Sequence, residues 1–140
     1  MKGAPEYASA IVAAHLLINI AHGLAHRELK ISLTPPEIVF VIIVILLLPL
    51  LAMGIAWTAR KQLGFLLLGI SMLGSLLFGL YHHFLVSSTD HVSIQPATWW
   101  GTVFVFTAYG LLVTEAIGTL AGLYFFRLGA QGPGKARLAR

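Results

Sequence analysis

Four apolar stretches of about 20 residues, separated by short polar segments, constrain this 140-residue chain more than any other feature. A helix of about 20 residues is long enough to cross the roughly 30 Å hydrocarbon core of a bilayer. The composition agrees, because only 10% of the residues are charged, against roughly 25% in an ordinary soluble domain. We therefore predict an all-α integral membrane protein, a four-helix bundle with up-down-up-down connections. The predicted spans cover about 6–26, 38–58, 63–86 and 99–126, in a single domain over 1–140 that ends in a flexible basic tail at 127–140.

Lysine and arginine residues are unevenly distributed between the two ends of these spans. Only Arg27 and Lys30 fall on the side opposite the termini. Because the cytoplasmic loops of membrane proteins are enriched in Lys and Arg, we expect both termini in the cytoplasm and a multi-pass protein of the cell (inner) membrane. The net charge of +4 then reflects topology, and we expect the lipid bilayer and no nucleic acid as partner. The charges on the side of the termini are Lys2, Arg60, Lys61, Arg127, Lys135, Arg137 and Arg140.

Helix boundaries and contact faces are also indicated. Thr34, two prolines and Glu37 are typical of a helix start, and Pro49 predicts a kink in the second span. Small residues in the third and fourth spans predict the faces along which helices pack. Among them, Gly118 and Gly122 have the GxxxG spacing that lets two helices approach closely. Ordinary packing within the bundle explains this spacing, and the alternative is a homo-oligomer that associates through the same two glycines.

Polar side chains inside the apolar stretches are the most informative residues for function. In the first span, His15, Asn19, His22 and His26 recur at spacings of four, three and four residues. At about 100° per residue, all four lie within an arc of roughly 60°. Exposure of such a stripe to lipid would cost several kcal/mol. We therefore expect this face of the first helix to point into the bundle.

Five of the six histidines are expected at one level, near the outer rim of the bundle. At about 1.5 Å per residue, the outer pair in the first span lies roughly 24 and 30 Å from the cytoplasmic end of its helix. A pair in the third span lies roughly 30 Å along its own helix, and a fifth histidine follows in the outer loop. These residues are His22, His26, His82, His83 and His91, with Asp90 beside the last.

This grouping predicts a metal site. Imidazoles at positions i and i+4 of a helix, such as His22 and His26, project to the same side and can bind one ion. A histidine of the third span and His91, with Asp90 as ligand or as outer-shell partner, would complete a three- or four-coordinate site. The chain has no cysteine, so zinc, Cu(II), nickel or iron suits it better than Cu(I). We predict a small membrane metal-binding protein whose histidine site, holding Zn, Cu or Fe, lies near the extracytoplasmic face.

A second polar group is expected deeper in the bundle. Glu115 and His15 lie at matching depths near the midplane, with Asn19 one turn above His15. A buried carboxylate must be protonated or paired, so we predict a His15–Glu115 hydrogen bond. This pair either fixes the register of two helices or acts as a proton relay or second metal position.

Two other classes of function remain open from the sequence. A haem-b-binding electron carrier would use one of His22 or His26 and one of His82 or His83 as axial ligands. A non-catalytic interaction subunit would use the polar stripe only to specify packing. Three histidines with an open metal position could also activate water, but no substrate is indicated and no catalytic residue is assigned.

Overall fold

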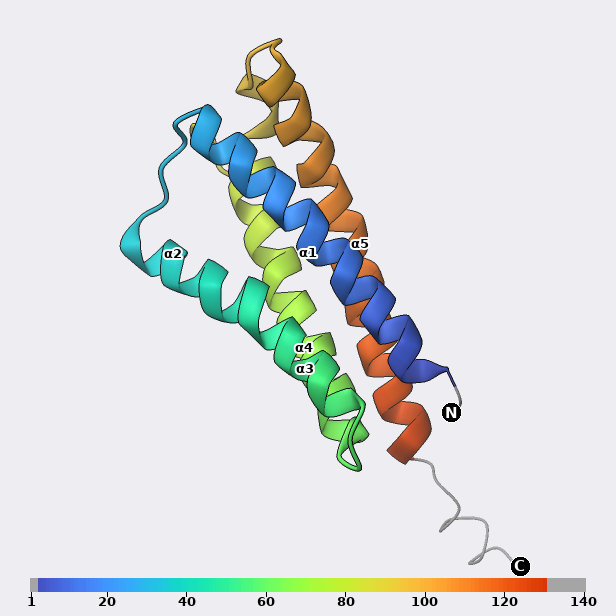
Figure 1. Cartoon of the computed structure of the whole chain (residues 1–140). Helices are drawn as coiled ribbons and strands as arrows, with labels where there is room; N and C mark the ends of the chain where they lie inside the picture. Colours follow the sequence, from blue (N-terminus) through green and yellow to red (C-terminus); the bar gives the residue numbers. More distant parts are fainter. Residues whose placement is uncertain (1–2, 131–140) are drawn as a thin grey trace, which may run out of the picture.

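The structure, a computed structural model, describes residues 3–130, and this range contains helices and no strand. Four helical stretches in it are long and apolar enough to cross a membrane, which confirms the predicted all-α class. Each overlaps one of the four ranges expected from the sequence. Figure 1 shows the stretches lying along one another, with the described ends of the first and last helices and the turn at 57–60 at the same end of the molecule. The elements are α1 (Ala4–Glu28), α2 (Pro35–Phe40), η1 (Val41–Leu47), α3 (Leu48–Ala56), α4 (Lys61–Leu80), η2 (Tyr81–Leu85), η3 (Val92–Ile94) and α5 (Trp99–Ala130).

The helices approach one another most closely at the end of the molecule that carries this turn. A side chain added at Gly122 of α5 would place its Cβ 2.5 Å from the backbone nitrogen of Gly69 in α4, and one added at Gly118 would meet Met72 at 2.8 Å. The two glycines of the GxxxG pattern are therefore in contact with other helices of the same chain. A cluster of buried apolar side chains lies at this end: Ala4, Ala8, Val12, Ala52, Ala56, Phe65, Leu68 and Met72.

The second stretch is irregular and separates from α1 at the other end of the molecule. It begins as expected at Pro35, where Glu37 Oε2 accepts a hydrogen bond from the backbone N–H of Thr34 at 2.6 Å. Pro49 cannot donate the backbone hydrogen bond of a regular helix, and the segment just before it, η1, is a π-helix. α3 packs against α4 and α1, whereas Figure 1 shows α2 displaced from α1.

The basic tail expected from residue 127 overlaps the end of α5, because residues 127–130 are helical. Gly129 lies next to Gln62 of α4, where a side chain would collide. Residues 131–140 lie outside the described range, together with three of the tail's charges and Lys2.

Candidate metal centre

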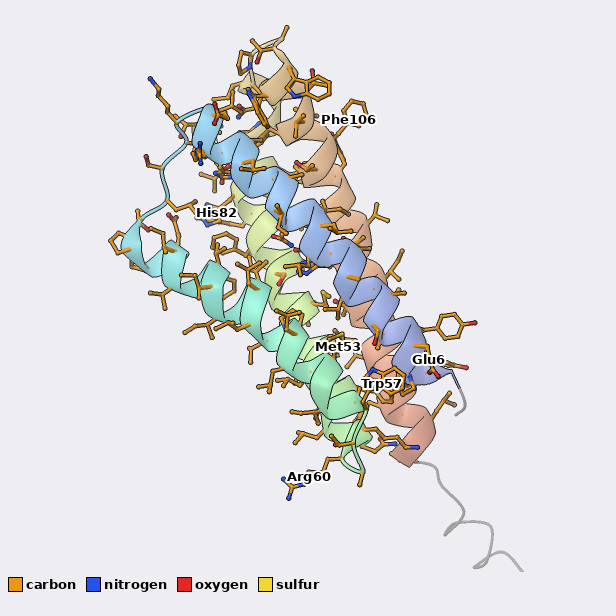
Figure 2. The ribbon with its side chains drawn as sticks, viewed as in Figure 1. Glu6, Met53, Trp57, Arg60, His82 and Phe106 are labelled. Atoms are coloured by element: carbon orange, nitrogen blue, oxygen red, sulfur yellow. The ribbon has the colours of Figure 1, made fainter. Side chains whose placement is uncertain are left out.

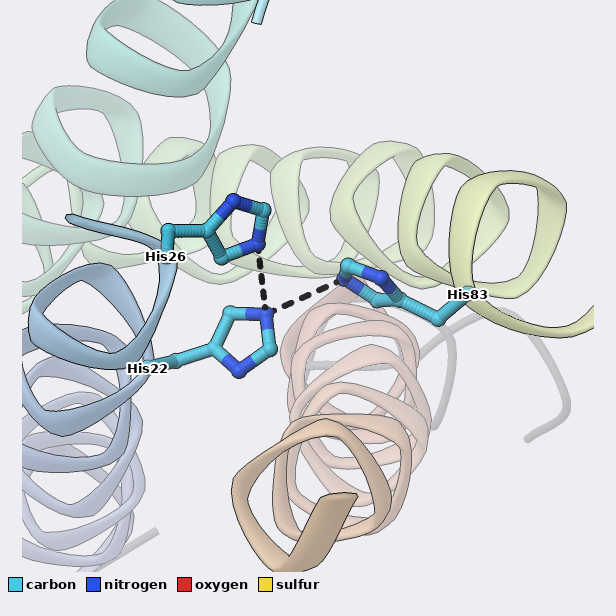
Figure 3. A group of neighbouring side chains, drawn as sticks. All are labelled: His22, His26 and His83. Atoms are coloured by element: carbon cyan, nitrogen blue, oxygen red, sulfur yellow. Dashed lines mark hydrogen bonds between the residues drawn. The ribbon is translucent and has the colours of Figure 1, made fainter. Parts of the chain in front are cut away.

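Three histidine rings meet between α1 and the end of the third stretch. Figure 3 shows His22 and His26 of α1 and His83 of η2 pointing toward one another. The Nε2 atom of His22 lies 3.2 Å from Nε2 of His83 and 3.2 Å from Nε2 of His26, and one ligand atom from each of the three residues falls within 4.8 Å of the others. Tetrahedral coordination with metal–nitrogen bonds of 2.0–2.1 Å puts the nitrogens about 3.3–3.4 Å apart. The three side chains could therefore hold one metal ion.

The tautomer of His22 follows from its hydrogen bonds. The hydroxyl of Thr107 lies 2.6 Å from the carbonyl oxygen of Val103, and since a carbonyl only accepts, the hydroxyl proton lies on this bond. The same hydroxyl oxygen lies 2.8 Å from Nδ1 of His22 and must accept the Nδ1 proton. In neutral His22 the proton is thus on Nδ1, and Nε2 carries a lone pair.

The same reasoning applies to His83. Its Nδ1 atom lies 3.1 Å from the backbone carbonyl oxygen of Asp90, which can only accept, so His83 also has its proton on Nδ1 and a lone pair on Nε2. The facing Nε2 atoms of His22 and His83 are then two acceptors 3.2 Å apart. Such a pair forms no hydrogen bond unless a cation, either a proton or a metal ion, lies between the nitrogens. Both side chains are buried, which makes a free imidazolium costly.

Asp90 supplies negative charge beside these rings. One of its carboxylate oxygens lies 3.1 Å from His26 Nε2 and 3.2 Å from His83 Nδ1, and the residue is only 5% exposed. Burial raises the pKa of Asp90, but the nearby Nδ1–H of His83 and the charges of the histidines lower it by more, so the pKa lies below its usual value. The carboxylate faces the Nδ1 edge of His83, where outer-shell partners of metal-bound histidines are found.

His82 does not join the cluster although it is adjacent to His83. Neighbouring positions on a helix differ by about 100° in direction, so only one of the two rings can face α1. The Nε2 atom of His82 lies 3.7 Å from a carboxylate oxygen of Glu37, and its ring centroid is 4.3 Å from that of Phe78. Figure 2 shows His82 on the side of the molecule next to α2.

His91 is also separate from the cluster. Its Nε2 donates to the backbone oxygen of Phe84 at 3.2 Å, and its Nδ1 accepts from the backbone N–H of Ser93 at 3.1 Å. Both ring nitrogens are engaged with backbone groups, of Phe84 in η2 and of Ser93 in η3, so three of the five predicted histidines meet at the cluster. Its neighbour Asp90, by contrast, points into the cluster.

The deeper polar group has the predicted hydrogen bond. His15 Nε2 lies 3.2 Å from Glu115 Oε1, and the two side chains are 2% and 3% exposed. The side chain of Asn19 instead donates to the backbone oxygen of His15 at 2.9 Å. The pair joins α1 to α5 within the bundle.

Two residues of α5 contact the cluster and were not predicted. Thr107 orients His22, and the ring of Phe104 packs against all three histidines with centroids 4.7–5.4 Å away. Thr107 lies eight residues before Glu115, about 80° away around the helix, so this spacing gave no clear signal for it. Phe104 gave no signal either.

The histidines line one end of a cavity of about 340 Å³. Its polar lining comes from α1, η2, α5 and Asp90, and reaches from the three rings to Asn19 and Glu115. The opposite lining is apolar and comes from the segment before α2 and from α2 and η1, through Ile31, Leu33, Ile38, Val41, Ile45 and Leu46.

Comparisons of the chain with protein-family models, curated proteins and solved structures give no match.

Proposed function

We propose that this chain is a multi-pass membrane protein that binds one divalent transition metal ion through the Nε2 atoms of His22, His26 and His83. The observation that carries the proposal is the pair of facing lone pairs. The Thr107 hydroxyl and the Asp90 carbonyl accept hydrogen bonds from the Nδ1–H groups of His22 and His83, so both Nε2 atoms are free to act as ligands. Metal-binding histidines commonly donate their other N–H in this way.

The donor set favours particular metals and a particular kind of site. Three imidazoles without thiolates suit zinc, Cu(II) or iron. Structural zinc sites use four protein ligands, whereas three protein ligands leave a position for water or another molecule. The cavity next to the rings provides space for such a molecule.

The distribution of charge supports an extracytoplasmic position for this site. Arg60 and Lys61 belong to the end of the molecule at which α1 begins and α5 ends, and Figure 2 shows Arg60 at that end. Arg27 and Lys30 lie at the opposite end, close in sequence to His26. With the richer end in the cytoplasm, the helices run up-down-up-down, both termini are cytoplasmic, and the histidines lie near the outer face.

The haem alternative receives less support from the geometry. Axial ligands of a haem lie on opposite faces of the macrocycle, and nitrogens 3.2 Å apart in His22 and His83 leave no room for it between them. The Nε2 atom of a third ring, His26, also lies 3.2 Å from Nε2 of His22. The arrangement suits a single ion.

The decisive experiment compares two adjacent histidines. Purified full-length protein and the variants His83→Ala and His82→Ala are equilibrated with Zn²⁺, dialysed and analysed for bound metal. We expect about one Zn²⁺ per chain in the unmodified protein and in His82→Ala. In His83→Ala we expect affinity to fall at least about 100-fold, the upper end of the loss caused by removing outer-shell partners.

His82→Ala is the matched control for His83→Ala, because both variants remove the same kind of ring from the same helix. Less than about a tenth of a metal ion per chain in the unmodified protein, with Cu²⁺ as well as Zn²⁺ supplied, would contradict the proposal. If both variants lose the same amount of Zn²⁺ affinity, binding does not depend on which histidine faces the cluster, and the cluster is not the binding site.

A further inference from the structure

The cavity beside the histidines has two chemically different sides. One end is formed by the three rings and Asp90, and the remainder is mostly apolar, with Val41, Ile45 and Leu46 of η1 forming part of the wall. Glu115 also lines the cavity, but one of its oxygens is already bonded to His15. A molecule that fits this space has one polar end and an apolar body. Cavities that bury small ligands begin at about 300 Å³, so its size is adequate.

One side of the cavity is closed by contacts between α2 and the end of the third stretch. Phe40 of α2 stacks on Phe78 of α4 with centroids 4.8 Å apart and an interplanar angle of 14°. The pair of Glu37 and His82 lies beside this stack at 3.7 Å. These contacts fix α2 against α4.

The other side, between α1 and α2, is open. Among residues 3–130, no hydrogen bond or ion pair joins α1 to α2 or η1. Gly23 of α1 and Ile38 of α2 both line the cavity, and both are exposed. Gly23 lies about five residues, or roughly 8 Å, from the outer end of α1. The opening is therefore apolar and, in a chain that spans the membrane, lies at the depth of the outer lipid leaflet.

Charge decides which polar end the cavity accepts. A divalent ion on three neutral imidazoles would carry two positive charges and would keep a coordination position open toward the cavity. A carboxylate is negatively charged and is a good oxygen ligand for zinc, so it suits this position. We infer that the cavity binds a single-chain lipid carboxylate that enters from the outer leaflet between α1 and α2, with its carboxylate on the metal ion and its hydrocarbon chain along η1. This inference rests on the proposed metal site.

Gly23 gives a way to block the opening without altering the ligands of the ion. A Cβ added at Gly23 would meet no atom within 4 Å, and the same holds for Gly54 on α3. Gly54 is exposed and does not line the cavity. The substitutions Gly23→Leu and Gly54→Leu are thus matched in chemistry and in freedom from collisions, but only the first fills the entrance.

The test uses the full chain in dodecyl maltoside micelles, loaded with Co²⁺ as a coloured substitute for the ion. Oleate is titrated while the visible Co²⁺ bands are recorded, and bound radiolabelled oleate is counted per chain; methyl oleate tests the need for a free carboxylate. We expect about one oleate per chain, a change in the Co²⁺ bands, and at least tenfold weaker binding of methyl oleate. Gly23→Leu should weaken oleate binding at least tenfold with Co²⁺ stoichiometry unchanged, and Gly54→Leu should change neither.

The possible failures are distinguishable. If Co²⁺ binds but oleate does not, or if oleate and methyl oleate bind alike, the lipid inference is overturned and the metal site stands. Oleate binding that is insensitive to Gly23→Leu overturns the proposed entrance in the same way. If the unmodified protein takes up no Co²⁺, the metal site and the lipid inference both fall. Should Gly23→Leu itself lose Co²⁺, Ile38→Trp narrows the same opening from α2 and takes its place.

Discussion

Two groups of histidine and carboxylate side chains lie against the same polar face of α1, and they differ in how their ring nitrogens are paired. In the deep pair, His15 and Glu115 are buried and bonded to each other at 3.2 Å. In the outer cluster, the Nε2 atoms of His22 and His83 face each other with lone pairs, because their Nδ1–H groups donate hydrogen bonds to other acceptors. The chemical types are the same in both groups, but the arrangement is not.

The difference separates a structural contact from a candidate site. A hydrogen-bonded pair needs no further partner and can serve helix packing alone. In the outer cluster the Nε2 lone pairs of His22 and His83 cannot bond to each other, and a carboxylate lies beside them, so the cluster can accept a cation. The residue types alone do not show which group is a structural contact and which is a candidate site, because both contain histidines and a carboxylate.

The strongest test of this contrast removes one partner of the deep pair. His15→Leu leaves the Glu115 carboxyl group buried without its partner. We expect it to lower the free energy of unfolding by about 3 kcal/mol, the lower end of the range for breaking a buried pair, since the carboxyl group can take up a proton. Thermal unfolding followed by circular dichroism measures the loss, and the double variant His15→Leu/Glu115→Leu should recover most of it. Loss of bound Zn²⁺ in folded His15→Leu would instead make the deep pair part of the metal site.

A smaller effect is expected from the residue that orients His22. Thr107→Val removes the acceptor for the Nδ1 proton and should weaken Zn²⁺ binding 10- to 100-fold, as is usual for outer-shell partners. Zinc titration against a competing chelator measures this change. Thr114→Val is the matched control, because the Thr114 hydroxyl donates only to carbonyl groups of its own helix. Equal affinities in the two variants would contradict the tautomer assigned to His22.

The smallest of the three effects concerns the charge next to the ion. Asp90→Asn preserves the shape of the side chain but removes the carboxylate beside His26 and His83. We expect about tenfold weaker Zn²⁺ binding, and no change in Glu28→Gln, where the carboxylate pairs with Arg27 at the surface. A loss as large as that in His83→Ala would make Asp90 a direct ligand.

Much of the fold was predictable because its signals are local. Each apolar stretch is long enough by itself to indicate a span, and Thr34 and Glu37 mark the start of α2 within four residues. The predicted end of the fourth span at residue 126 was too early, since α5 runs to Ala130 and Gly129 lies against Gln62 of α4. That contact joins residues far apart in the sequence, and no pattern near residue 127 reports it.

The site was predictable in part. The spacing of His22 and His26 placed both rings on one face, and helix length placed His83 at the same level. Length could not choose between His82 and His83, because both lie at the same depth and only the rotation of the third stretch separates them. The engagement of His91 with backbone groups in its loop was equally invisible.

By itself, the sequence determined that the chain is helical, that four stretches are long and apolar enough to cross a membrane, and that a polar stripe on α1 needs partners inside the bundle. These properties follow from composition and from the repeat of a single helix. The sequence also paired Glu115 with His15 by depth, and the structure has that hydrogen bond. Only the tertiary structure decided which side chains face the outer part of the stripe, namely His83, Thr107 and the Asp90 carbonyl. The reason is physical, since the direction and pairing of a ring depend on how neighbouring helices are rotated and spaced, and packing over the whole chain sets those quantities.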